Sequence, residues 1–268
     1  MLKTLYSFRD RVLANACVAL EDRVLDVGCG DGLIAFGALE RLGPRGEVVF
    51  SDISQDLLDQ CRAVAHEMGG LERCRFVKAS AECLTPIESA SIDVVTTRSV
   101  LIYVTEKGDA FKEFHRVLRP GGRLAIFEPI NRFPVSLPDH LRGGFHGYDV
   151  TPVSDIARKM AAVYKAQEPE VKPMIDFDER DLLRFAAESG FVEIHLDFRV
   201  DITHVKPRRW ETLLHSSGNP MEPTLEEIMD EVLIDEEKRC FSEYLRPLVE
   251  SGSGMQRSAT AYLWATRP

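Results

Sequence analysis

Short apolar runs alternate with amphipathic helical segments over the first half of the chain. Apolar and β-branched residues predict five strands, at 24–27, 47–50, 75–77, 92–96 and 123–127. Apolar side chains at helical spacing predict a leading helix at 4–20 and further helices at 33–42, 55–68 and 106–118. This alternation favours a parallel sheet with right-handed crossovers and with helices on both faces.

The second half of the chain follows a looser pattern. Prolines and glycines punctuate residues 129–152, where we expect an irregular segment that acts as a lid. Beyond it the pattern predicts a helix at 153–166, a helix between Asp178 and Gly190, and strands at 192–200 and 259–266. Between these strands, the capping-box pattern Thr224-Leu225-Glu226-Glu227 and a helix at 235–251 indicate a helical insertion.

Composition narrows the class of protein. The 268 residues are 44% hydrophobic and 28% charged, which is enough apolar material for a packed core. A net charge of −10 without a dense basic run argues against nucleic acid as a partner. Six cysteines without a CxxC pair favour reduced thiols over a structural zinc site. No stretch of the sequence is apolar enough to span a bilayer, so we expect a cytoplasmic protein that does not enter the membrane.

A glycine-rich turn, Gly28-Cys29-Gly30-Asp31-Gly32, joins the first strand to the helix that follows it. The dinucleotide fingerprint GxGxxG needs a small residue where Leu33 stands, and a P-loop would end in Gly-Lys-Ser/Thr. Asp26, just before the turn, suits a ligand that carries an ammonium group. Asp52 ends the second strand 20 residues after Gly32, the spacing at which an acidic side chain reaches ribose hydroxyls. The ligand should therefore contain both an ammonium group and a ribose.

Five motifs in order carry a resemblance to a known family. They are Val24-Leu25-Asp26-Val27-Gly28-Cys29-Gly30-Asp31-Gly32, the acidic Asp52, Ser80-Ala81-Glu82, Ile92-Asp93-Val94-Val95 with Val100-Leu101, and Leu118-Arg119-Pro120-Gly121-Gly122-Arg123-Leu124. Together they resemble class I S-adenosylmethionine-dependent methyltransferases, in the branch of small-molecule and quinone methyltransferases. The resemblance covers about residues 20–130 and resumes at 176–200. It implies an α/β, Rossmann-like fold with a mostly parallel seven-stranded sheet whose last strand is antiparallel, and S-adenosyl-L-methionine as cofactor.

The same resemblance assigns cofactor contacts to positions of this sequence. Gly28, Cys29 and Gly30 would pass under the methionine part of the cofactor, with Asp26 near its ammonium group. Asp52 would accept hydrogen bonds from both ribose hydroxyls, and Ile53 would pack on the adenine ring.

Further contacts follow from the third and fourth strands. Ala81 would offer its backbone N–H to the adenine edge, and the backbone carbonyl of Arg98 would meet the ammonium group. The family usually has Asp where this chain has Ser80. The adenine amino group would therefore be bound by the Ser80 hydroxyl or by Glu82.

Candidates for catalysis lie in the segment after the fifth strand. A hydroxyl or amine acceptor needs a general base, and histidine is the usual base near neutral pH. His146, Tyr148 and His140 are our candidates for a base or a substrate ligand. Two alternatives stay open: a solvated lid whose histidines bond only to backbone, and a metal site built from His140, His146 and Asp149. Nothing in the sequence fixes a metal geometry, so we expect no metal.

We expect one domain over residues 1–268. Its predicted parts are a leading helix (1–20), a cofactor-binding core (21–130), a lid or substrate segment (131–175), a closing helix and strands (176–202 and 256–268) and a helical insertion (203–255). The insertion either roofs the acceptor pocket or mediates contacts in a homodimer.

The expected activity is methyl transfer from S-adenosylmethionine to O, N or C of a small organic acceptor, a specialised metabolite. One alternative is a protein of the same fold that binds the cofactor in a regulatory role without methylating. Another is a nicotinamide-dependent oxidoreductase, with which Leu33 conflicts.

Overall fold

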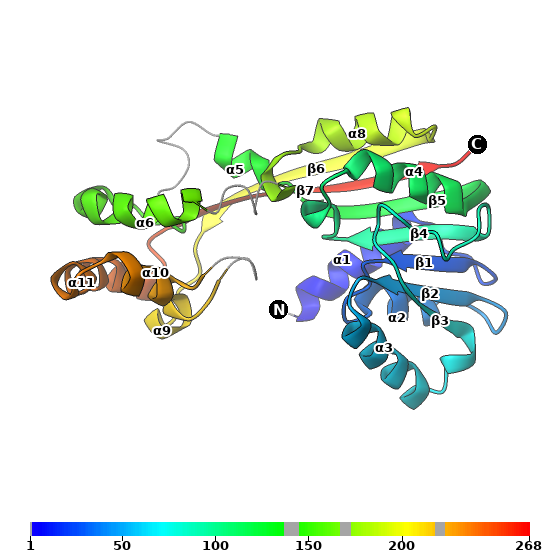
Figure 1. The fold of residues 1–268 in the computed structure, drawn as a ribbon, viewed down its shortest axis with the longest axis horizontal. Helices are drawn as coiled ribbons and strands as arrows, with labels where there is room; N and C mark the ends of the chain where they lie inside the picture. The colour runs from blue at the N-terminus through cyan, green and yellow to red at the C-terminus, as the bar shows by residue number, and fades with distance from the viewer. Residues whose placement is uncertain (1, 137–144, 167–172, 218–222) are drawn as a thin grey trace. The chain divides into compact units, whose positions relative to one another are not determined.

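The computed structural model describes residues 2–136, 145–166, 173–217 and 223–268, and the chain divides into two compact units (Figure 1). Unit 1 comprises Met1–Ile130, Phe177–Arg199 and Thr260–Pro268. Unit 2 comprises Asn131–Asp176 and Val200–Ala259. The sequence analysis treated the lid segment and the helical insertion as parts of one domain, whereas the structure groups both segments in unit 2.

A seven-stranded sheet has the order β3-β2-β1-β4-β5-β7-β6. Its strands are β1 (Arg23–Val27), β2 (Glu47–Asp52), β3 (Cys74–Lys78), β4 (Ile92–Arg98), β5 (Leu118–Pro129), β6 (Val192–His204) and β7 (Met255–Thr266). The pairs β1–β2, β1–β4, β2–β3 and β4–β5 are parallel, and β7 runs antiparallel to β5. The predicted fold class is confirmed, including the antiparallel last strand.

Helices cover both faces of the sheet in unit 1. They are α1 (Leu2–Asn15), α2 (Leu33–Leu39), α3 (Gln55–Glu67), α4 (Lys107–Val117) and α8 (Glu179–Glu188). Val24 of β1 shares one core with residues of α1, α2 and α3. The next residue, Leu25, is also fully buried, and successive strand residues point to opposite faces. On the other side, α4 packs on β5 and α8, with the rings of Phe111 and Phe185 in contact.

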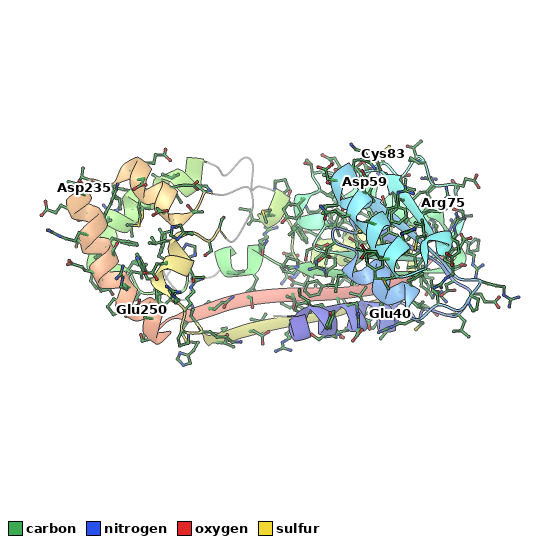
Figure 2. The ribbon with its side chains drawn as sticks, turned by 90° about the horizontal axis from the view of Figure 1, so that it is seen from below. Glu40, Asp59, Arg75, Cys83, Asp235 and Glu250 are labelled. Carbon is green, nitrogen blue, oxygen red and sulfur yellow. The ribbon has the colours of Figure 1, made fainter. Side chains whose placement is uncertain are left out.

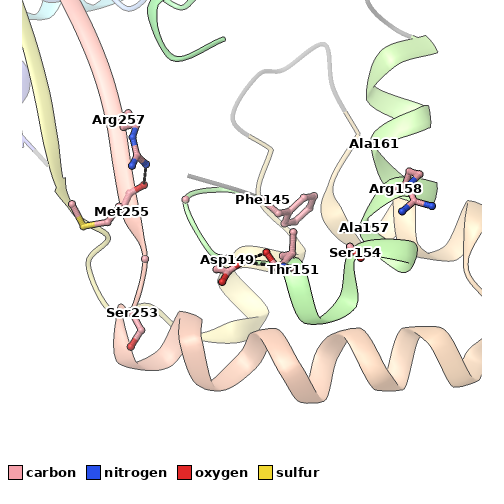
Figure 3. A pocket seen from close by; sticks show the side chains of 13 residues that line it. Phe145, Asp149, Thr151, Ser154, Ala157, Arg158, Ala161, Ser253, Met255 and Arg257 are labelled. Carbon is pink, nitrogen blue, oxygen red and sulfur yellow. Dashed lines mark hydrogen bonds between the residues drawn. The ribbon is translucent and has the colours of Figure 1, made fainter. Parts of the chain in front are cut away.

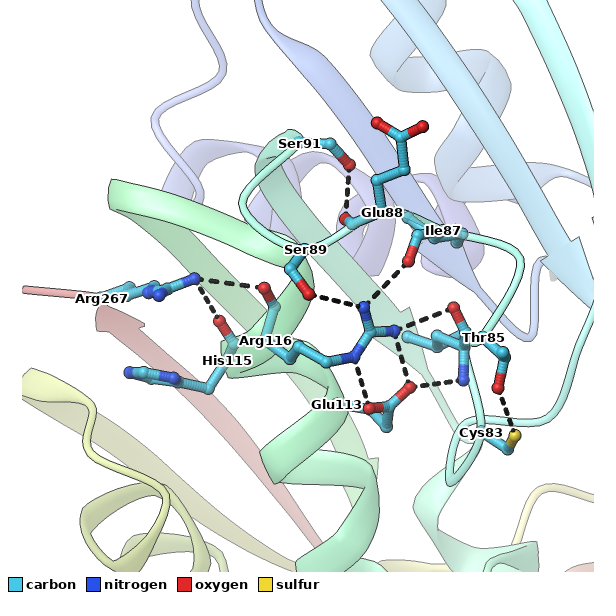
Figure 4. A network of polar contacts seen from close by, with 11 residues as sticks. Cys83, Thr85, Ile87, Glu88, Ser89, Ser91, Glu113, His115, Arg116 and Arg267 are labelled. Carbon is cyan, nitrogen blue, oxygen red and sulfur yellow. Dashed lines mark hydrogen bonds and ion pairs between the residues drawn. The ribbon is translucent and has the colours of Figure 1, made fainter.

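Two side chains of α4 hold the connection between β3 and β4, which contains no helix (Figure 4). Glu113 accepts a hydrogen bond of 2.7 Å from the Leu84 N–H, and Arg116 donates to the carbonyls of Leu84 and Ile87. Arg116 also pairs with Glu113, and this hydrogen bond lowers the pKa of the Glu113 carboxyl. The backbone groups of a loop without helix partners are thus satisfied by side chains.

Unit 2 contains helices around a core of its own. They are α5 (Arg132–Ser136), α6 (Ser154–Ala166), α9 (Trp210–Leu214), α10 (Leu225–Val232) and α11 (Asp235–Ser251). Trp210 and Phe241 are among the fully buried residues of this core. Asp235 begins α11, and Glu250 lies one residue before its end (Figure 2). The predicted capping box at Thr224 is confirmed, because its side chain accepts from the Glu227 N–H and Glu227 accepts from the Thr224 N–H.

Two predicted boundaries are wrong. The leading helix ends at Asn15 and not near residue 20, because Cys17 takes a left-handed φ of 48°, which ends a helix. Residues 120–122, which precede the strand predicted at 123–127, form a bulge inside β5. Leu118 pairs with Ile92 and Arg123 pairs with Val94, so extra residues of β5 loop out, and Gly121 permits this with a φ of 77°.

No helix in the described ranges is both long and apolar enough to cross a bilayer.

Candidate functional site

The glycine turn lies where the order of the strands in the sheet reverses. From β1 the chain builds outward through β2 and β3 on one side, while β4 pairs with β1 on the other side. Open α/β sheets bind ligands at the carboxyl ends of the strands at such a switch point. Residues 28–32 follow the carboxyl end of β1 and therefore stand at the expected ligand position.

Three glycines of the turn are left-handed, but for different reasons. Gly28, Gly30 and Gly32 have φ values of 64°, 56° and 83°. A Cβ at Gly28 would lie 2.3 Å from Val100 Cγ2, and a Cβ at Gly32 would lie 2.5 Å from the Phe36 ring. A Cβ at Gly30 would meet no described atom within 4 Å. Gly28 and Gly32 thus permit close packing of the protein on itself, whereas the space beside Gly30 is open.

Asp52 joins the glycine turn to the end of β2. Its Oδ2 accepts a hydrogen bond of 2.9 Å from the Gly30 N–H, and its Oδ1 accepts one of 2.9 Å from the Ser54 N–H. A carboxylate has about four acceptor positions, so each oxygen can still accept from a ligand hydroxyl. The next side chain, Ile53, is 70% exposed although it is aliphatic. An acidic group with free acceptor positions therefore lies next to the open space at Gly30, and an exposed aliphatic residue follows it in the chain.

Asp26 is buried beneath the turn. Its Oδ1 accepts a 2.9 Å hydrogen bond from Thr96 Oγ1 and its Oδ2 accepts from the Ala35 N–H at 3.1 Å. Burial raises the pKa of Asp26 to about 7, although both hydrogen bonds oppose the rise. This carboxyl group fixes the start of α2 against β4. Its predicted contact with an ammonium group stays a prediction.

The loop after β3 lies against Asp52. The Ala79 N–H donates to the Asp52 carbonyl at 3.1 Å, and Ser80 and Cys83 form an antiparallel bridge. Ala81 is buried, and Glu82 accepts a long hydrogen bond from the Glu106 N–H. The structure thus brings Ser80, Ala81 and Glu82 near Asp52. Their predicted contacts with adenine stay predictions.

Glu128, at the end of β5, was missed by the sequence analysis. It is fully buried, and its Oε1 accepts from the Val100 and Leu101 N–H groups at 2.9 and 3.0 Å. Its Oε2 is buried without a hydrogen-bond partner among the described residues. Burial raises the pKa of Glu128 to about 7. Since Val100 packs on Gly28, this carboxyl group positions the residue that borders the glycine turn.

Arg98 and Cys29 complete the set of predicted cofactor residues. Arg98 is the last residue of β4, and its positive charge lies close enough to Asp26 to oppose the rise in that pKa. Cys29 is buried, and a hydrogen bond with Cys61 together with burial raises the pKa of its thiol. A neutral, buried thiol is a weak nucleophile. The predicted contact of Cys29 with the cofactor stays a prediction.

The catalytic candidates belong to unit 2. His146 has a left-handed φ of 49°. Its side chain is exposed at the surface, yet the protein packed around it and the charge of Arg208 lower its pKa. Tyr148 is fully buried in the core of unit 2, and its hydroxyl has no partner among the described residues. His140 lies outside the described residues. The roles of all three stay predictions.

A metal site finds no support in the described part of the chain, where no group of three or more His, Cys, Asp or Glu side chains is arranged to hold an ion. The alternative built from His140, His146 and Asp149 includes a residue outside that part.

One segment of the chain matches a known family of proteins. Residues 25–126 match the family model described as "Methyltransferase domain". Over these residues the chain is similar to a methyltransferase domain. The matched segment begins in β1 and ends in β5, so it contains the glycine turn, Asp52 and the loop after β3.

Curated relatives resemble this chain over part of their length. The protein named ubiquinone/menaquinone biosynthesis C-methyltransferase UbiE from Francisella philomiragia is 34% identical over 121 residues, which are 45% of this chain and 48% of that protein. The chain thus spans about half the length of the curated relatives it matches.

Solved structures share the fold over nearly the whole chain. A methyltransferase structure from Bacillus halodurans has a TM-score of 0.58 at 20% identity and covers 98% of this chain and 99% of its own. The geranyl diphosphate C-methyltransferase from Streptomyces coelicolor, solved with S-adenosyl-L-homocysteine, has a TM-score of 0.57 at 19% identity, with 98% and 76% covered. At these identities the likeness concerns the fold.

Proposed function

We propose that this chain binds S-adenosylmethionine at the glycine turn and transfers its methyl group to a small organic acceptor. The observation that carries the proposal is the open space at Gly30 beside the Asp52 carboxylate, with the exposed Ile53 next along the chain. A ribose needs a hydrogen-bond acceptor, and an aromatic base needs an apolar surface.

Each residue of the turn has a task in this proposal. Asp52 accepts from the ribose hydroxyls with its remaining acceptor positions while it holds Gly30 in place. Ile53 covers one face of the adenine. Gly28, Cys29 and Gly30 line the methionine part, and Asp26 acts from below by fixing the turn to α2 and β4.

Bound at this turn, S-adenosylmethionine would supply a methyl group on a positively charged sulfur. The positive charge on sulfur disappears as the methyl group moves. The chain has mainly to align the acceptor with that carbon and to exclude water. Glu128 contributes by holding the loop from Val100 to Leu101 at the edge of the site.

We further propose His146 as the proton acceptor when the substrate must lose a proton. Its lowered pKa keeps the imidazole neutral at pH 7, the form that can take a proton. Tyr148 and His140 remain the other candidates for this role.

We propose a general class of methyl acceptor and one specific acceptor to test first. The general class is a small molecule methylated on O, N or C, and a specialised metabolite is the substrate type we favour. A quinone precursor methylated on carbon is the first specific acceptor to test, because the similar Francisella philomiragia protein carries that activity in its name. The second candidate function is cofactor binding without methyl transfer.

The experiment measures binding and turnover separately. Calorimetry with S-adenosylhomocysteine tests the site, and release of S-adenosylhomocysteine from S-adenosylmethionine in the presence of quinone precursors, phenols and amines tests transfer. Tight binding with turnover on one acceptor supports the proposal. Tight binding without turnover on any acceptor favours the regulatory alternative, and absence of binding rejects both.

A further inference from the structure

Two cysteine side chains meet beside the glycine turn. Cys29 belongs to the turn itself, and Cys61 lies on α3, the helix that follows β2. The Cys61 thiol donates to the Gly30 carbonyl at 3.4 Å, and the Cys29 sulfur lies 3.9 Å from the same oxygen. A hydrogen bond also joins the two thiols. Both sulfurs therefore lie against the backbone of the residue that borders the open space.

The two thiols differ in how far they are covered. Cys61 is 1% exposed, and a Cβ at Gly32 would lie 3.2 Å from its sulfur, so α3 packs directly on the turn at this point. Cys29 is 6% exposed and precedes Gly30, beside which the space is open. A reagent as small as hydrogen peroxide can therefore approach Cys29, whereas the sulfur of Cys61 is shielded.

The hydrogen bond between the thiols makes them chemically unequal. It lowers the pKa of Cys61, although burial opposes this effect, and it raises the pKa of Cys29 together with burial. One proton lies between the two sulfurs, so the pair holds a thiolate more readily than a single buried thiol does. The thiolate is the form that attacks a peroxide or another sulfur.

We propose that Cys29 and Cys61 form a reversible disulfide in the presence of peroxide, and that this bond weakens cofactor binding at the glycine turn. A covalent bond is shorter than a hydrogen bond between the same sulfurs, so it draws Cys29 toward α3. The turn must then distort, because the Gly30 N–H donates to Asp52 and the Cys29 N–H donates to the Ser51 carbonyl. The effect on the cofactor rests on the proposed function, whereas the disulfide does not.

Hydrogen peroxide is the oxidant in this reaction. The Cys29 thiol takes one oxygen as the O–O bond breaks, which gives a sulfenic acid and one water. The Cys61 sulfur then attacks the Cys29 sulfur, so that the S–S bond forms, the S–O bond breaks and the oxygen leaves as a second water. The two protons and two electrons that the thiols lose thus reduce one peroxide to two waters. A dithiol reagent reverses the step by exchange.

A peptide map tests the disulfide on the unaltered chain. The chain is treated with hydrogen peroxide, its remaining thiols are alkylated, and its peptides are identified by mass spectrometry without reduction. The expected result is a Cys29–Cys61 link that dithiothreitol removes. Oxidation without this link, whether to sulfinic acid or to links between other cysteines, overturns the proposal.

Calorimetry with S-adenosylhomocysteine tests the effect on the cofactor. The oxidised chain should bind about 10-fold more weakly or worse, the size of one lost hydrogen bond, and dithiothreitol should restore the affinity. Equal affinities of the disulfide form and the reduced form overturn the regulation. A reduced chain that does not bind rejects the proposed function and the regulation with it, while the peptide map still decides the disulfide.

Variants assign the response to this pair. Cys61→Ser keeps a donor for the Gly30 carbonyl and removes the disulfide, so its affinity for S-adenosylhomocysteine should be the same before and after peroxide. Cys74→Ser is the matched control, because the Cys74 thiol also donates to a backbone carbonyl, that of Gly70, at 3.3 Å. This variant should keep the full response. A loss of affinity with peroxide in Cys61→Ser as large as in the unaltered chain contradicts the proposal.

The exposed cysteines call for one further control. Both measurements are repeated on a chain that carries serine at the three exposed positions, which are Cys17, Cys83 and Cys240. The link and the loss of affinity should persist in this chain. Their disappearance would assign the response to an exposed thiol and overturn the assignment to Cys29 and Cys61.

Discussion

The backbone N–H of Gly30 donates a hydrogen bond of 2.9 Å to Oδ2 of Asp52, across 22 residues of sequence. This contact joins the turn after β1 to the end of β2. The Cys29 N–H adds a second link through the Ser51 carbonyl at 2.9 Å. Asp52 therefore shapes the turn as well as presenting acceptor positions to a ligand, and its replacement should affect both tasks.

Asp52→Ala should weaken S-adenosylhomocysteine binding by about 1.5–3 kcal/mol, the usual size of hydrogen bonds to a charged group. Calorimetry on the purified variant measures the change. Asp59→Asn is the control, because Asp59 is exposed on α3 (Figure 2). Identical affinities for Asp52→Ala and the unaltered chain would remove the ribose assignment.

Gly30→Ala should keep the fold and lose the cofactor. The positive φ of 56° costs a residue with a Cβ about 1–2 kcal/mol of stability, but that Cβ meets no described atom. It would occupy the space assigned to the ligand. Urea unfolding and calorimetry on one sample separate the two effects, and normal cofactor affinity would show that the ligand does not approach Gly30.

Gly28→Ala should lose more stability than Gly30→Ala. Its φ of 64° carries a similar backbone cost, and its Cβ would also lie 2.3 Å from Val100 Cγ2. The double variant Gly28→Ala with Val100→Ala relieves the contact and should recover part of the loss in urea unfolding. If Val100→Ala brings no recovery in the double variant, the packing of Val100 on Gly28 is not the cause.

Glu128→Gln should reduce the pH dependence of stability. The pKa of Glu128 is raised from 4.5 to about 7 by burial, so the folded state holds a proton that the unfolded state releases. The stability from this group is fully present below pH 4.5 and is lost as the pH rises through about 7. Glutamine keeps an acceptor for the Val100 and Leu101 N–H groups without the titration.

Free energies of unfolding at pH 5 and pH 8 measure this effect. Relative to the unaltered chain, Glu128→Gln should lose less stability between these values. A residual loss should remain, since Asp26 also has its pKa raised to about 7. Glu88→Gln is the exposed control. An unchanged difference between the two pH values in Glu128→Gln would mean that Glu128 is ionised throughout.

His146→Ala should reduce kcat by about 100-fold or more if proton removal limits the rate. Because the pKa of His146 is lowered, kcat of the unaltered chain should be level near pH 7 and fall only below the usual range of histidine. His204→Ala, at an exposed position of β6, is the control. A normal kcat in His146→Ala would restrict this histidine to a structural role.

Local chemistry made much of the fold predictable from sequence. Ser54 caps α3 through its contact with the Leu57 N–H, and Asp178 caps α8 with a capping box. Both residues stand directly before helices that the sequence predicted. The glycine turn and Asp52 were visible because their spacing along the chain is fixed by one strand and one helix.

Features that depend on how strands far apart in the sequence pair could not be predicted from local patterns. Glu128 contacts Val100 only because β4 and β5 pair in one register, and a glutamate after Ile126-Phe127 at the end of a buried strand was the only signal. The pocket of unit 2 that Figure 3 shows is lined by residues of 145–161 and 253–257, two segments about a hundred residues apart. No local sequence pattern predicted that residues 131–176 and 200–259 form one unit, because that grouping depends on contacts between distant segments.

The most direct test of the central claim is a crystal structure of the chain with S-adenosylhomocysteine. The account predicts ribose hydroxyls within hydrogen-bond distance of the Asp52 carboxylate, adenine against Ile53 and the amino-acid part beside Gly30. A ligand bound elsewhere, or a glycine turn that stays empty at saturating ligand, would contradict it.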